Sequence, residues 1–135
     1  MLLLDTHAWI WFVQGNDKLQ RHAVKAIEAS IQSRTLHIAA ISQWELAMLI
    51  DKSRIILNEP ALSWIQKAIA HLHIKVAPLT AEIAVESGQL PADFHGDPAD
   101  RMIVATARIH QLTVVTRDAK ILSYGASNHV KVIEI

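Results

Sequence analysis

The chain has 135 residues, 51% hydrophobic and 19% charged, which is typical of a single globular domain (residues 1–135) with a sizeable core. No apolar run approaches the roughly 20 residues of a membrane span, the start lacks a basic signal-peptide region, and cysteine is absent, so we expect a soluble, cytoplasmic protein without membrane partners or thiol chemistry. The 13 basic and 13 acidic residues cancel, so no global field would attract a nucleic acid.

The N-terminal part of the chain alternates short apolar runs with longer amphipathic ones. A buried strand is predicted over residues 2–5, followed by a helix over residues 6–13 that ends before Gly15. Apolar residues at helical spacing predict a second helix over residues 18–33. The next apolar run predicts a strand over residues 36–40.

Two further helices are predicted in the middle of the chain. Ser42 and Glu45 match the S-x-x-E capping box, which makes Ser42 the predicted N-cap of a helix that continues to Ile50. Pro60 suits the first turn of a helix whose apolar positions extend to Leu72.

The C-terminal part repeats this alternation. Strands are predicted over residues 74–77, 113–116 and 130–133. Helices are predicted over residues 80–89, 98–110 and 118–122. Short apolar strands that alternate with helices predict an α/β fold, a three-layer sandwich with a central parallel sheet of about five strands.

Four acidic residues fall where predicted strands end or predicted helices begin. They are Asp5, Glu45, Asp100 and Asp118. In open α/β sheets, active sites form at the carboxyl ends of the strands, so acids that are far apart in the chain can meet there. Carboxylates packed together repel one another unless a cation screens them. The pattern therefore predicts a site for a divalent metal ion.

Each acid also has a structural explanation, because short polar side chains cap helices. Asp5 and Asp118 precede predicted helices, and Glu45 would complete a capping box. Asp97 precedes a proline and is assigned mainly to capping. Asp100 is preferred as a ligand because it shares a helix face with apolar residues that point toward the sheet. Singly these positions favour neither role, but four at one end of a sheet favour a ligand set.

Oxygen ligands alone suit Mg²⁺ or Mn²⁺, and such a site fits phosphodiester hydrolysis best. Arg101 and Arg117 lie beside proposed ligands and are the nearest candidates for phosphate contacts. His7 and His95 lie close in sequence to the acids, so either could contact substrate or orient a ligand.

Four stretches of the chain together resemble the PIN domain family, and within it the VapC-like toxins of type II toxin–antitoxin pairs. They are LLLDTHAWIW at the start, ISQWELAMLI around Glu45, HGDPADRMIVATA around Asp100 and LTVVTRDAKI around Asp118. The resemblance covers nearly the whole chain. It implies a PIN-like fold and a Mg²⁺-dependent endoribonuclease that cleaves RNA, with Asp5, Glu45, Asp100 and Asp118 as its catalytic, metal-binding acids.

The resemblance also implies partners and further site residues. The partners would be a cognate antitoxin protein, which blocks the active site, and a second copy of the chain in a homodimer. Thr6, Ser42 and Thr116 match small polar positions beside the acids and are candidates for substrate binding. Asp97 occurs in the D-P-x-D-R version of the motif, so it either binds metal or only caps a helix.

Two other classes of function fit parts of the pattern. A receiver-like signalling domain would also place Asp5, Thr116 and Lys120 at strand ends, although the chain lacks the acidic pair expected after the first strand. A non-catalytic binding module would use all of the acids as caps, and replacing Asp5 by Asn would then change nothing.

The four tryptophans also have two interpretations. Trp9 and Trp11 cannot both face the same side of one helix, so we expect core burial for one and allow exposure for the other. An exposed tryptophan would be an anchor for a dimer or antitoxin interface. Trp44 and Trp64 fit either role.

Overall fold

The structure, a computed structural model, describes residues 1–94 and 96–135. Its five strands form one parallel sheet in the order β3-β2-β1-β4-β5. The strands are β1 (Leu2–Leu4), β2 (Leu36–Ala39), β3 (Lys75–Ala77), β4 (Thr113–Thr116) and β5 (Lys131–Glu134). The helices are α1 (Thr6–Gln14), α2 (Arg21–Gln32), α3 (Ala40–Asp51), α4 (Ala61–His71), α5 (Ala81–Gly88), α6 (Pro98–His110) and α7 (Ala119–Ala126). The α/β fold with a central parallel sheet is confirmed.

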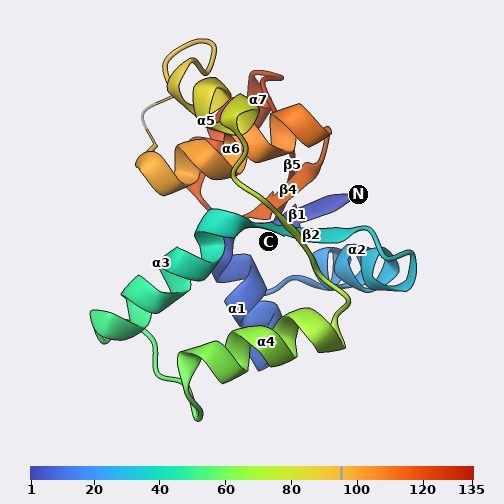
Figure 1. The fold of residues 1–135 in the computed structure, drawn as a ribbon. Helices are drawn as coiled ribbons and strands as arrows, with labels where there is room; N and C mark the ends of the chain where they lie inside the picture. Colours follow the sequence, from blue (N-terminus) through green and yellow to red (C-terminus); the bar gives the residue numbers. More distant parts are fainter. Residues whose placement is uncertain (95) are drawn as a thin grey trace.

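Helices cover both faces of the sheet, with α5, α6 and α7 on one face and α1, α2 and α4 on the other (Figure 1). Leu2 and Leu4 of β1 pack with the layer of α1, α2 and α4, whereas Leu3 joins the core beneath α6. All three residues of β1 are buried. A strand covered on both faces needs an apolar residue at every position, which explains the continuous Leu run.

Helix α3 links the two helical layers, since it contacts α6 as well as α1 and α4. It begins at Ala40, directly where β2 ends, and Ala39 is its N-cap without a side-chain hydrogen bond. The prediction that Ser42 caps this helix is therefore wrong. The chain passes from strand to helix with no loop, which leaves the buried Ser42 inside the first turn.

Other element boundaries differ slightly from those predicted. Helix α2 begins at Arg21, later than predicted, because Asn16 accepts a hydrogen bond from the backbone N–H of Lys18 in a preceding turn. Helix α7 continues to Ala126, beyond the predicted end. Helix α6 and strand β4 have the predicted bounds. No helix among residues 1–94 and 96–135 is long and apolar enough to cross a membrane.

Candidate metal centre

The site lies where β1 and β4 end side by side. These strands are parallel neighbours, with Leu4 opposite Val115. From β1 the chain builds β2 and β3 on one side, and then returns to build β4 and β5 on the other. Such a reversal of strand order leaves a crevice at the carboxyl ends of the strands, where α/β proteins bind ligands.

Asp5 is the buried carboxylate at the end of β1. Its Oδ1 accepts a hydrogen bond from the backbone N–H of Thr6 at 2.7 Å, and its Oδ2 accepts one from the hydroxyl of Thr116 at 2.7 Å. Burial raises the pKa of Asp5, and these two hydrogen bonds oppose the rise. The same side chain thus caps α1 and contributes to the site.

Glu45 reaches the site from α3 and does not take part in a capping box. Thr6 donates its hydroxyl hydrogen to Glu45 Oε1 at 2.6 Å, and its oxygen lies 2.9 Å from Ser42 Oγ. Burial raises the pKa of Glu45, the bond from Thr6 lowers it, and the charges of Asp5 and Asp97 raise it further. Thr6 therefore couples the start of α1 to α3 beside the acids.

Two acids come from the start of α6. Asp97 is the N-cap, and its Oδ1 accepts a hydrogen bond from the backbone N–H of Asp100 at 2.8 Å, as capping predicts. Glu45, Asp97 and Asp100 each offer one carboxylate oxygen, and these oxygens lie within 4.8 Å of one another. Asp97 is exposed while the other two are half-buried, so this group of acids faces solvent on one side.

Asp118 follows β4 and caps α7. Its Oδ1 accepts a hydrogen bond from the backbone N–H of Ile121 at 2.9 Å, and its own N–H donates to Thr116 Oγ1 at 3.0 Å. The hydroxyl of Thr116 thus accepts from Asp118 and donates to Asp5. This hydroxyl therefore connects the end of β1, which carries Asp5, to the start of α7, which carries Asp118.

A cavity of about 470 Å³ lies between these segments. It is lined by Asp5, His7, Trp11, Glu45, Asp97, Asp100, Arg117 and Asp118. The structure therefore brings the four predicted acids, and Asp97, around one space. Burial, followed by the charges of the other four acids, raises the pKa of Asp100 to about 7.

This donor set fits a hard divalent cation. The acids offer carboxylate oxygens, the ligand type that Mg²⁺ and Mn²⁺ prefer. The pKa values of Asp5, Glu45 and Asp100 are all raised, because burial and mutual repulsion disfavour their charged forms. A bound cation would relieve both penalties. Hydroxyl donors to Asp5 and Glu45 already hold their carboxylates in place.

The two predicted arginines have different surroundings. Arg117 is exposed and lines the cavity. Arg101 donates through Nε to the carbonyl of Ser87 at 2.8 Å and through Nη1 to the carbonyl of Phe94, so it holds the segment that leads into α6. A phosphate contact by Arg101 stays a prediction. The predicted role of His95 falls outside the described residues.

Trp11 also lines the cavity, although the sequence pattern did not single it out as a site residue. It lies one helical turn after His7, and their ring centroids are 5.8 Å apart. The spacing of four residues from His7 was the signal that could have placed it on the same face of α1. Trp9 and Trp64 are buried in the core, whereas Trp44 is 56% exposed.

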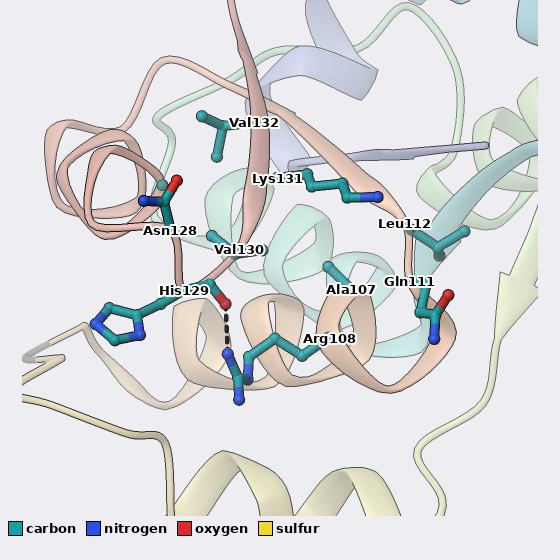
Figure 2. A pocket seen from close by; sticks show the side chains of 10 residues that line it. Ala107, Arg108, Gln111, Leu112, Asn128, His129, Val130, Lys131 and Val132 are labelled. Atoms are coloured by element: carbon teal, nitrogen blue, oxygen red, sulfur yellow. Dashed lines mark hydrogen bonds between the residues drawn. The ribbon is translucent and has the colours of Figure 1, made fainter.

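A larger cavity of about 670 Å³ lies between α6, α7 and β5. Figure 2 shows its lining side chains, including Arg108, which donates to the backbone carbonyl of His129. The described residues that line this cavity include no aspartate or glutamate. It therefore lacks the carboxylate ligands that the smaller cavity offers.

The sequence matches a described family and a named protein. The model of the PIN domain family matches residues 2–126. A protein named Ribonuclease VapC22, from Mycobacterium tuberculosis, is 39% identical over 123 residues, which are 91% of this chain and 91% of that protein.

Solved structures share the fold at lower sequence identity. The structure of VapBC2 from Rickettsia felis bound to a DNA fragment from their promoter has a TM-score of 0.71 and 15% identity, and the match covers 98% of this chain and 97% of that chain. The structure of DNA-bound VapBC from Salmonella typhimurium has a TM-score of 0.70 and 20% identity, with 99% and 98% covered. These likenesses support the three-layer fold.

Proposed function

The chain belongs to the PIN domain family, and from this premise we propose that it is a metal-dependent endoribonuclease that acts as the toxin of a toxin–antitoxin pair. The observation that carries the proposal is the convergence of carboxylates around one cavity at the carboxyl ends of β1 and β4. The name of the relative, Ribonuclease VapC22, supports RNA as the substrate. Family membership leaves the receiver-like alternative without support.

We assign the metal ligands to four of the acids that line the cavity. They are Asp5, Glu45, Asp100 and Asp118. When bound, Mg²⁺ or Mn²⁺ would polarise a phosphate oxygen and make water a stronger acid. The acids hold the ion, and hydrogen bonds from Thr6 and Thr116 hold the carboxylates of Glu45 and Asp5 in the required orientation.

The remaining polar residues of the site have proposed roles of their own. Asp97 caps α6 and lies close enough to Glu45 and Asp100 to share an ion with them. The exposed side chain of Arg117 contacts a phosphate of the RNA at the rim of the cavity. A cation at the rim offsets the repulsion that RNA would feel from the acids.

We also propose an antitoxin protein as a partner and a homodimer as the assembly. The related solved structures include complexes described as VapBC, and another is described as a toxin–antitoxin complex from Klebsiella pneumoniae. Large apolar side chains of this chain are exposed, including Trp44, Leu62 and Val85. Surfaces of this kind suit burial against protein partners.

Cleavage of an RNA pool by the purified protein tests the proposed activity. We expect cutting with Mg²⁺ or Mn²⁺ and none with EDTA. Asp5→Asn and Asp100→Asn should each lower the rate by about a hundredfold or more, because losing a group that only orients a metal ligand already costs up to about a hundredfold. The matched control is Asp51→Asn, which changes an exposed acid at the end of α3 outside the cavity.

The outcome decides between the enzyme and a binding module. Folded Asp5→Asn and Asp100→Asn variants that cut RNA as fast as the Asp51→Asn control would show that these two acids have only a structural role. Loss of cutting in the first two variants alone would establish the carboxylate site.

A further inference from the structure

Trp11 offers an aromatic surface beside the acids. Part of its side chain packs against the hydrophobic core under α1, and another part lines the carboxylate cavity. Packing against the core restricts the orientations that the indole can adopt before any ligand binds. A ring that is restricted in this way at the wall of a cavity is suited to stacking, because less side-chain entropy is lost on binding.

Two exposed cations lie over this ring. Lys18 Nζ is 5.0 Å from the ring centroid, and Arg117 Cζ is 5.6 Å from it. The ion pairs within residues 1–94 and 96–135 involve other side chains, so neither cation is paired with a carboxylate there. Both positive charges are therefore available to an anionic ligand, even though Arg117 shares a cavity with the acids.

We propose that the indole of Trp11 stacks on one unpaired base of the RNA, while Arg117 and Lys18 contact backbone phosphates next to that base. This inference rests on the proposed ribonuclease function. In that function Trp11 would position the RNA substrate. Arg117 lines the cavity and serves the phosphate nearer the acids. Lys18 lies over the same ring and serves a neighbouring phosphate.

The combination of an aromatic ring and cations selects for single-stranded nucleic acid. A base inside a duplex is covered on both faces, whereas an unpaired base can offer one face to a ring. Exposed contacts between a cation and an aromatic ring are weaker than base stacking on such a ring. An incoming base can therefore replace Lys18 or Arg117 over Trp11, and the displaced cation gains a phosphate as its partner.

Binding of an RNA that lacks bases tests this proposal. The probe is a short, fluorescein-labelled, single-stranded oligoadenylate RNA, compared with the same RNA made abasic at its central nucleotides. Fluorescence anisotropy with Mg²⁺ gives both dissociation constants for the Asp100→Asn protein, in which cutting is suppressed. Four further changes are added singly to this protein: Trp11→Leu, Trp11→Phe, the matched control Trp44→Leu, and Arg117→Gln.

We expect the Asp100→Asn protein to bind the intact RNA about tenfold more tightly than the abasic RNA, as stacking on one aromatic ring predicts. Trp11→Leu should abolish this preference, and Trp11→Phe should retain most of it because a ring remains. Trp44→Leu should retain all of it. Arg117→Gln should weaken binding of both RNAs equally and reduce the dependence of affinity on salt.

Equal affinity for the two RNAs would overturn the proposal, and this comparison needs no folded Trp11 variant. Failure to bind either RNA, or a preference that survives in folded Trp11→Leu, would overturn it as well. The proposed nuclease function is judged separately by metal-dependent cleavage. A protein that cuts RNA but binds the intact and the abasic RNA with equal affinity would disprove only the stacking role of Trp11.

Discussion

The hydroxyl of Thr116 links two of the acids, since it donates to Asp5 and accepts from the backbone N–H of Asp118. We predict that Thr116→Val lowers the free energy of unfolding by about 1–3 kcal/mol, because it leaves buried polar groups without partners. The proposed RNA cleavage should fall by about tenfold or more, since a group that orients a proposed metal ligand is lost. Urea unfolding and a cleavage assay measure these two effects.

Thr116→Ser is the matched control, because it keeps the hydroxyl and removes only a methyl group. We expect the Ser variant to stay close to the original protein in cleavage rate. If the Val variant cleaved RNA as well as the Ser variant does, the hydrogen bond to Asp5 would have no part in holding the site.

Local patterns predicted the acids that cap helices but not the contacts between elements. Asp5, Asp97 and Asp118 each precede a helix and each accepts a backbone N–H at its start. The bond from Thr6 to Glu45 joins residues 39 positions apart, and it depends on how two helices pack around the sheet. Sequence spacing does not determine that packing, and the nearby S-x-x-E pattern therefore predicts a cap that the structure does not have.

Among the elements, two helical glycines differ in what surrounds them. A Cβ at Gly125 of α7 would lie 2.6 Å from a methyl carbon of Val132 in β5, whereas nothing lies within 4 Å of a Cβ at Gly88 of α5. Alanine is favoured over glycine in a helix by about 1 kcal/mol, but overpacking costs about 1–3 kcal/mol. We predict that Gly125→Ala lowers the free energy of unfolding by about 1 kcal/mol and that Gly88→Ala raises it by about 0.5 kcal/mol.

Urea unfolding of the two variants side by side measures this difference, and adding Val132→Ala to Gly125→Ala should restore part of the loss by making room. Should Gly125→Ala stabilise the protein as much as Gly88→Ala does, α7 and β5 would not be packed as closely as the structure has them.

The bounds of an element were predictable where residues typical of a helix start or a strand end occur in the sequence. Pro98 marks the first turn of α6, and the apolar run of β4 ends in threonine, so both elements have their predicted bounds. The start of α3 was not predictable, because β2 continues into it without a turn residue. The order of the strands was not predictable either, since a buried apolar strand has no residue that identifies its neighbours.

At the scale of the whole molecule, the position of the site could be predicted from the parallel sheet alone, without knowing the order of the strands. Every parallel strand ends at the same edge, so Asp5 and Asp118 had to lie on that edge whichever strands were neighbours. In the observed order β3-β2-β1-β4-β5, β1 and β4 are neighbours, which brings the segments that carry these two acids together. Trp11 lines the same cavity for the same reason, since α1, which carries it, starts where β1 ends.

The crowded acids should make the stability of the whole protein depend on pH and on metal. The pKa of Asp100 is about 7 in the folded protein and 3.8 in its ordinary state, so between these values the folded chain keeps a proton that the unfolded chain releases. The free energy of unfolding should therefore fall as pH rises from about 4 to about 7 in EDTA. The raised pKa values of Asp5 and Glu45 act in the same direction.

Magnesium should reverse this trend if it binds as proposed, because the ion would bind the deprotonated acids and stabilise only the folded chain. We predict that Mg²⁺ raises the melting temperature more at about pH 8 than at about pH 5, where protons compete for the carboxylates.

Asp100→Asn removes one of the repelling charges, so in EDTA it should flatten the pH dependence and raise the melting temperature at about pH 8 by about 3 °C. Thermal unfolding with and without Mg²⁺ measures both effects. If the original protein and Asp100→Asn had the same dependence of melting temperature on pH in EDTA, Asp100 would not titrate near neutral pH. The repulsion among the carboxylates in the cavity would then be too weak to raise its pKa.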